Sequence, residues 1–293
     1  MKAAAFSYAR ATSVANAIAL LAQHGERAKV LSGGQSLTPA MNLRLITPEL
    51  IVDIGALDEL RGTTTRDGLI SIGALTRQSD LQQAAEIEQY APLLKLAAAD
   101  IAHPAIRNRG TIGGSLAHAD PAAELPACMV ALNATIVVRG EGRERRIPAA
   151  NFFGGIYETA MTPQELLVAV ELPLPRKNAA HFFREFARRR GDFAIVGLAA
   201  QAALEGGRIL EFRPVFFGVS DRPILSQAAT GPIGKTVTPE IVSKSLQALS
   251  DELEPPDDQA ASAAMRRHLT KVLLRRCVAE LLGRPELNDG GKP

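Results

Sequence analysis

The apolar residues of this chain come only in short runs. The longest run, residues 194–200, ends at Gln201, whereas a helix that crosses a membrane needs about 18 or more consecutive apolar residues. At the N-terminus, Tyr8 and Arg10 interrupt the apolar segment before it reaches the length of a secretory signal. The sequence therefore predicts a chain without a membrane span, with the cytoplasm as its expected location.

Composition narrows the classes of function. The chain has 293 residues, a length that suggests about two domains, and 46% hydrophobic residues are enough to bury a core. Its 33 basic and 31 acidic residues give a net charge of +2, which provides no reason to expect a nucleic-acid partner. Cys128 and Cys277 are too few and too far apart for an iron–sulfur site, a zinc ribbon or a disulfide framework.

Short strands alternate with short helices through the first half of the chain. A polar, proline-containing segment at 173–178 marks the boundary that we expect between two domains, 1–177 and 178–293. We expect strands at 29–31, 50–54, 69–73, 134–139, 166–172, 182–186, 194–204 and 208–219, helices at 13–24, 80–97 (interrupted at Pro92), 238–249 and 262–282, and a frayed tail at 288–293.

The first glycine segment, residues 32–37, reads Ser-Gly-Gly-Gln-Ser-Leu and directly follows the strand expected at 29–31. Paired glycines let the backbone approach a ligand closely and expose consecutive N–H groups, which together can bind a diphosphate. The spacing matches neither the dinucleotide-fold fingerprint nor a P-loop, and no helix-start signal follows. Taken alone, such a segment is a weak signal and is more often a plain turn than a ligand site.

The second glycine segment, residues 108–115, reads Asn-Arg-Gly-Thr-Ile-Gly-Gly-Ser. It again combines a glycine pair with hydroxyl side chains, those of Thr111 and Ser115. Asp120 and Glu124 follow and can accept hydrogen bonds from ribityl or ribose hydroxyls. Two such segments in separate parts of the chain fit an extended dinucleotide held between two lobes.

Other reactive side chains point to structural roles. His103 and His118 lie near the second glycine segment but lack the spacing of metal ligands, so we predict no metal site. No Gly-x-Ser-x-Gly nucleophile motif occurs, and no catalytic acid or base is predicted. The arginines of the helix expected at 262–282 form either a solvated face or a docking surface.

The two glycine segments and the residues around them resemble a known family. The matching stretches are residues 32–37, residues 102–121, residues 165–167 ahead of Leu172-Pro173, and residues 190–197 (Arg-Gly-Asp-Phe-Ala-Ile-Val-Gly). In order and spacing, the chain resembles the FAD-binding medium subunit of the molybdenum hydroxylases, the group that includes carbon monoxide dehydrogenase and xanthine dehydrogenase.

The resemblance implies an α+β fold that the sequence pattern alone does not predict. Residues 1–177 would form a two-lobed FAD-binding domain of the vanillyl-alcohol-oxidase (PCMH) type, divided near 55–60. Residues 178–293 would form a small α+β domain with a three-stranded sheet. FAD would lie extended between the lobes, with its diphosphate on the two glycine segments.

The resemblance also implies which positions bind FAD. Arg184 falls where relatives often have lysine, and Phe193 falls where an apolar or aromatic residue covers one face of the isoalloxazine. His118 and Glu124 replace other polar residues of relatives, which leaves their hydrogen-bonding roles open. The implied FAD-binding residues are Val30, Leu31, Ser32, Gly33, Gly34, Gln35, Ser36, Leu37, Ile101, Ala102, Thr111, Gly113, Gly114, Ser115, His118, Asp120, Glu124, Leu167, Arg184 and Phe193.

In this family, molybdopterin and [2Fe–2S] clusters are carried elsewhere, so the resemblance implies two partners for a chain of this length. These are a small iron–sulfur subunit and a large molybdopterin subunit, in a dimer of heterotrimers. The chain would take electrons from the [2Fe–2S] clusters and pass them to an external acceptor. Two alternatives stay open: a stand-alone FAD-dependent oxidoreductase, and a module that keeps the fold without the cofactor.

Overall fold

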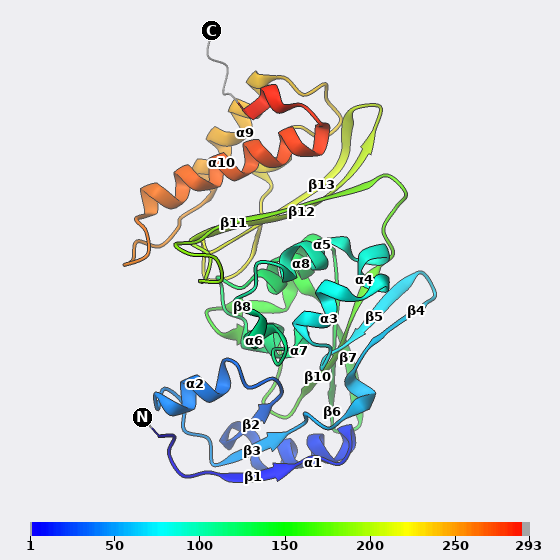
Figure 1. The fold of residues 1–293 in the computed structure, drawn as a ribbon, viewed down its shortest axis with the longest axis vertical. Coiled ribbons are helices and arrows are strands. Elements are labelled where there is room, and N and C mark those ends of the chain that lie inside the picture. The colour runs from blue at the N-terminus through cyan, green and yellow to red at the C-terminus, as the bar shows by residue number, and fades with distance from the viewer. Residues whose placement is uncertain (1, 289–293) are drawn as a thin grey trace.

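The structure, a computed structural model, describes residues 2–288. Figure 1 shows three parts stacked along the long axis: a small N-terminal sheet, a middle part of short helices on a larger sheet, and a C-terminal sheet covered by two longer helices. The mixture of helices and strands confirms the expected α+β class. Apart from Asn288, the expected tail lies outside the described residues. Within the described part, no helix is both long and apolar enough to cross a membrane.

The N-terminal sheet places the first glycine segment. Its three parallel strands have the order β1-β3-β2, and helix α1 (Val14–His24) packs its apolar face on them. Parallel strands end at the same edge of a sheet, so the chain segments that follow β2 and β3 lie side by side. The strands are β1 (Ser7–Arg10), β2 (Ala28–Leu31) and β3 (Leu50–Asp53).

The middle part is built on a five-stranded antiparallel sheet of order β4-β5-β10-β6-β7. Two of its strands, β4 and β7, escaped prediction because they carry almost no apolar residues. Both lie at edges of the sheet, where polar side chains face water. The strands are β4 (Thr63–Arg66), β5 (Leu69–Gly73), β6 (Thr135–Gly140), β7 (Arg143–Pro148) and β10 (Leu166–Pro173), and a small separate pair is β8 (Phe153–Gly155) with β9 (Glu158–Thr159).

Short helices cover this sheet. The helix expected at 80–97 is in fact three helices, because Ala84 and Ala91 adopt non-helical backbone angles and Pro92 starts a new helix. Helices α5 and α8 supply much of the buried core. The helices are α3 (Gln78–Gln83), α4 (Ala85–Tyr90), α5 (Pro92–Ala98), α6 (Pro104–Arg107), α7 (Ile112–His118) and α8 (Glu124–Ala131).

The C-terminal part has the three long antiparallel strands that were expected, together with a two-residue edge strand, in the order β11-β12-β13-β14. One face of the sheet carries Phe182 and packs with the two C-terminal helices. The other face carries Phe183 and Phe217, which belong to the core shared with α5 and α8. The elements are β11 (Ala179–Phe186), β12 (Val196–Glu205), β13 (Arg208–Phe217), β14 (Ile224–Leu225), α9 (Pro239–Glu252) and α10 (Ala263–Leu282).

The boundary placed after residue 177 falls in the connection between β10 and β11 and stays a prediction. Single turns of 3-10 helix complete the chain, at Gly25–Arg27, Asp58–Leu60, Ala149–Asn151, Ala228–Thr230 and Pro285–Asn288.

Candidate functional site

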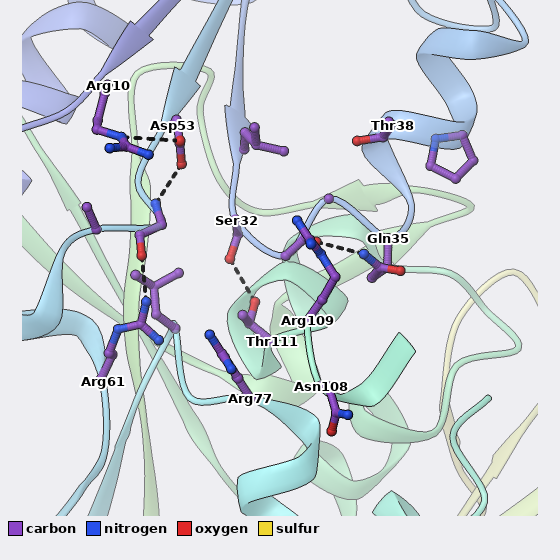
Figure 2. A pocket seen from close by; sticks show the side chains of 17 residues that line it. Arg10, Ser32, Gln35, Thr38, Asp53, Arg61, Arg77, Asn108, Arg109 and Thr111 are labelled. Carbon is purple, nitrogen blue, oxygen red and sulfur yellow. Dashed lines mark hydrogen bonds and ion pairs between the residues drawn. The ribbon is translucent and has the colours of Figure 1, made fainter. Parts of the chain in front are cut away.

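The two glycine segments are in direct contact (Figure 2). The Ser32 and Thr111 hydroxyl oxygens are 2.8 Å apart and share a hydrogen bond. Gly33 lies so close to the second segment that a Cβ there would be 2.3 Å from the Arg109 carbonyl oxygen and 2.8 Å from the Gly110 Cα. Only glycine permits this approach, so Gly33 joins the two parts of the chain.

The first glycine segment leaves a row of backbone donors free. Within residues 2–288, the N–H groups of Gly33, Gly34, Gln35 and Ser36 have no protein acceptor. Gly34 has a φ of +72°, and the Gln35 side-chain amide donates to the Gly33 carbonyl over 3.0 Å. Consecutive N–H groups around a left-handed residue form a concave anion-binding nest.

A helix starts in the first glycine segment, contrary to expectation. Helix α2 (Leu37–Asn42) begins directly after Ser36, whose side chain makes no capping hydrogen bond. Serine commonly precedes a helix, so this signal was present in the sequence and was overlooked. The missing capping hydrogen bond leaves the nest open to a ligand.

The second glycine segment is different, because its glycines lie inside a helix. Thr111 caps α7 and accepts the Gly114 N–H over 3.1 Å. The N–H groups of Ile112 and Gly113 donate to Thr76 and Ala74 carbonyls, so these donors are taken by the protein. A Cβ on buried Gly113 would be 2.6 Å from the Ala74 Cβ, whereas one on Gly114 would face Thr111 and Ser32.

A cavity of about 770 Å³ opens where the two segments meet. Four arginines line it, and Figure 2 shows their side chains around the hollow. Arg10 is 3.7 Å from Asp53 and Arg61 donates to the Gly55 carbonyl. In the described part of the chain, the guanidinium groups of the other two, Arg77 and Arg109, have no acceptor or acidic partner. The cavity therefore combines free N–H donors with uncompensated positive charge, as a diphosphate requires.

Six of the expected FAD-binding residues line this cavity, and several lining residues were not expected. Asp53 ends β3 and Gly55 comes two residues later, and the rule that ligands bind at the carboxyl ends of parallel strands could have identified them. No sequence signal brings Arg10, Arg61 and Arg77 together, because they come from separate elements. The expected residues that line the cavity are Leu31, Ser32, Gly33, Gly34, Gln35 and Thr111.

A second group of expected residues follows the C-terminal end of α7. The His118 ring stacks on Tyr157 with centroids 4.8 Å apart, and Asp120 accepts the Ala122 N–H over 2.9 Å. Glu124 is only 7% exposed, and burial raises its pKa to about 7, with the charges of Asp120 and Asp100 adding to the shift. Burial lowers the pKa of His118.

A third group of expected residues, Ile101, Ala102 and Phe193, lies where the loop before β12 contacts the segment before α6. A Cβ on Gly191, whose φ is +87°, would be 2.9 Å from the Ala102 carbonyl oxygen. Arg107 donates to the carbonyls of Ile101 and Ala102 over 2.7 and 3.0 Å. Phe193, in the same loop, is 68% exposed. The structure thus brings the segment that carries Phe193 against Ala102.

Two expected residues lie elsewhere. Leu167 is buried in the core of the middle part. Arg184 lies on the α10 side of its sheet, where it contacts Glu280 over 2.9 Å. The next residue, Glu185, faces the middle part instead, and burial raises its pKa to about 8, with the charges of Glu124 and Asp100 adding to the shift. Val30 packs on the N-terminal core, Ser36 and Leu37 start α2, and Ser115 lies in α7.

Comparisons with known proteins match the whole of this architecture. The family model described as the FAD binding domain in molybdopterin dehydrogenase matches residues 4–175, and that of the CO dehydrogenase flavoprotein C-terminal domain matches residues 181–281. The chain is 39% identical to the 6-hydroxypseudooxynicotine dehydrogenase complex subunit alpha of Paenarthrobacter nicotinovorans, over 97% of both chains. It is 33% identical to the carbon monoxide dehydrogenase medium chain of Hydrogenophaga pseudoflava, over 93% of this chain and 96% of that one.

Two solved structures superpose on nearly the whole of this chain. A carbon monoxide dehydrogenase chain from Hydrogenophaga pseudoflava superposes with a TM-score of 0.94 at 34% identity, covering 97% of this chain and 99% of that one. A chain of quinoline 2-oxidoreductase from Pseudomonas putida 86 gives 0.91 at 34% identity, with the same coverage. The cofactor of this chain is accordingly FAD, and the chain is an oxidoreductase component. The chain belongs to the family of FAD-binding medium subunits of the molybdenum hydroxylases.

Proposed function

We propose that this chain is the electron-transfer subunit of a heteromeric molybdenum hydroxylase. It takes electrons from the [2Fe–2S] clusters of a partner and passes them to an external acceptor. Bound FAD supplies the redox chemistry, because its isoalloxazine accepts and releases electrons. The protein supplies binding, orientation and electrostatics.

The observation that carries the proposal is the row of N–H groups at Gly33–Ser36, which have no acceptor among residues 2–288, beside Arg77 and Arg109, whose guanidinium groups have no partner there. These groups bind the FAD diphosphate: the N–H groups donate to its oxygens, and the two guanidinium groups balance its charge. The Ser32–Thr111 hydrogen bond keeps the two walls of the cavity together while the ligand is bound.

The isoalloxazine end of FAD is assigned to the second and third groups of residues. Ile101, Ala102 and Phe193 lie in segments that touch each other. His118 ends α7, Asp120 lies between the helices and Glu124 starts α8. Glu124 keeps its carboxyl partly protonated near neutral pH, so it can donate as well as accept a hydrogen bond. Arg184 has no part in this assignment, because it faces α10.

The proposed partners are a small iron–sulfur subunit and a large molybdopterin subunit, in a cytoplasmic dimer of heterotrimers. Support comes from the relatives, which are named as a complex subunit and as medium chains of larger enzymes.

Co-expression with the neighbouring genes and purification through a tag on this chain tests the proposal. We expect a stable heteromer that contains FAD, iron and molybdenum, in which substrate reduces the flavin. A chain that purifies alone with FAD and turns over a substrate without partners would support the stand-alone oxidoreductase instead. A chain without flavin would contradict both functions.

A further inference from the structure

The loop that carries Phe193, residues 187–195, joins β11 to β12. Its apolar packing lies at its end, where Ala194 is buried and Ile195 packs on the core under the C-terminal helices. Phe193 is 68% exposed. At the base of the loop, the Ile195 N–H donates to the Phe186 carbonyl over 2.7 Å. An exposed loop held only at its base would not keep an aromatic ring in one position, so further contacts must hold it.

One of these contacts comes from Arg266 of α10, which is 4% exposed. Its Nη1 donates to the carbonyl of Ile195 over 2.5 Å and to that of Gly218 over 2.6 Å. Its Nη2 donates to both carboxylate oxygens of Asp258, over 2.9 and 2.7 Å. A buried arginine is costly without such partners, so its place at the end of the loop is well determined.

The segment that orients Arg266 also contacts the loop directly. Arg188, near the start of the loop, donates to the Gln259 carbonyl over 2.6 Å. Asp258 is itself held in a tight turn, because its Oδ1 accepts the N–H groups of Ala260 and Ala261 over 2.8 and 3.1 Å. The segment 257–262 therefore holds both ends of the loop, one through Arg188 and the other through Arg266.

The same arginine reaches the middle part of the molecule through Gly218. A Cβ on Gly218, whose φ is +72°, would be 2.7 Å from the Ile195 carbonyl oxygen. The Gly218 N–H donates to the Pro121 carbonyl over 2.9 Å. Pro121 follows Asp120, so a continuous set of hydrogen bonds runs from Asp258 through Arg266 and Gly218 to the segment after α7.

From these contacts we infer that Arg266, oriented by Asp258, is a positioning residue: it fixes Phe193 and the Asp120–Pro121 segment relative to each other, and so sets the environment of the isoalloxazine. The inference rests on the proposed place of the flavin beside Phe193. Arg266 touches no reacting atom and acts only through the two segments that it joins.

The test uses the purified heteromeric complex with its FAD and the Asp258→Asn substitution. Asp258 lies in an exposed segment, so the variant removes the charge that orients Arg266 without opening the core. We expect retained FAD, a changed visible circular dichroism spectrum of the flavin, and a change on the order of threefold in the oxidised-to-reduced ratio in a fixed redox buffer. Phe193→Leu should change the same spectrum, and Arg266→Lys should change it at least as much as Asp258→Asn, because a lysine cannot reproduce the two-nitrogen contacts of Arg266.

Arg267→Lys is the matched control, because Arg267 is the next residue of α10 and donates to the Leu253 carbonyl, away from the loop. It should leave both flavin readouts unchanged. If Phe193→Leu alters the spectrum and Asp258→Asn only lowers the melting temperature, the positioning role is wrong while the flavin assignment stands. If neither alters it, the flavin does not lie beside Phe193 and the inference fails; a wild-type complex without flavin would overturn the proposed function itself.

Discussion

The first and second glycine segments have similar sequences, but their backbone N–H groups have different partners. In the first, the N–H groups of residues 33–36 are free and surround a left-handed Gly34. In the second, the corresponding groups bond to Thr76, Ala74 and Thr111, and Gly113 serves only to let α7 pack on Ala74. A glycine pair therefore does not by itself leave backbone donors free for a phosphate.

The largest expected effect comes from Gly33→Val, which would break the contact between the two segments. Even a Cβ would lie 2.3 Å from the Arg109 carbonyl oxygen, and backbone cannot move aside as a flexible side chain can. We expect loss of FAD and a stability cost of about 3 kcal/mol or less. The flavin absorbance per chain after purification measures the loss of FAD, and urea unfolding measures the stability cost. Full FAD occupancy would contradict the role given to Gly33.

Gly113→Ala tests whether the second glycine segment contributes to the packing of α7 or to the binding of FAD. Its methyl group would overlap Ala74, so we expect a destabilisation of about 1–3 kcal/mol. Because Gly113 does not line the cavity, the folded variant should bind FAD with unchanged affinity, measured by fluorescence titration of the apoprotein. A large loss of affinity without loss of stability would mean that the second segment binds the diphosphate after all.

Removing one positive charge from the cavity should have a smaller effect on FAD binding. Arg77→Gln and Arg109→Gln each remove an unpaired guanidinium, and we expect about tenfold weaker FAD binding with a reduced salt dependence. Arg66→Gln is the control, because Arg66 pairs with Asp67 outside the cavity. Equal effects from all three substitutions would show that only net charge matters.

The last prediction concerns the stability of the chain and two buried carboxyl groups, those of Glu124 and Glu185. Burial raises the pKa of Glu124 to about 7 and that of Glu185 to about 8, so the folded chain binds more protons than the unfolded chain. Their contribution to stability is complete below the unfolded pKa and is lost as the pH rises through 7 and 8. We expect the unfolding free energy to fall between about pH 5 and 8, by at most about 1.4 kcal/mol per pH unit for each carboxyl that is protonated only in the folded chain.

Glu185→Gln should flatten this slope, whereas Glu26→Gln, on the surface far from the pair, should leave it as in wild type. Chemical unfolding of the apoprotein at several pH values measures both. Parallel slopes for wild type and Glu185→Gln would show that Glu185 is ionised throughout.

Sequence reasoning identified the central strands and the helices α1 and α9 because their apolar residues recur with a clear period, and it placed α10 although that helix is not amphipathic. It missed β7, whose arginines suit an edge strand, and it joined α3 to α4, because Ala84 carries no breaking signal. The break expected at Pro92 is where α5 starts. For the site, it identified the backbone at 31–35 and Thr111. It could not identify Arg10, Arg61 and Arg77, because only the sheet topology brings β1, the turn after β3 and the start of α3 to one cavity.

The central claim is that the N–H groups of residues 33–36, with Arg77 and Arg109, hold the diphosphate of FAD. An experimental structure of the FAD-loaded complex tests it most directly. The account predicts phosphate oxygens about 3 Å from those nitrogens and within hydrogen-bonding distance of at least one of the two guanidinium groups. A diphosphate bound elsewhere, with water on the N–H groups of the first glycine segment, would contradict it.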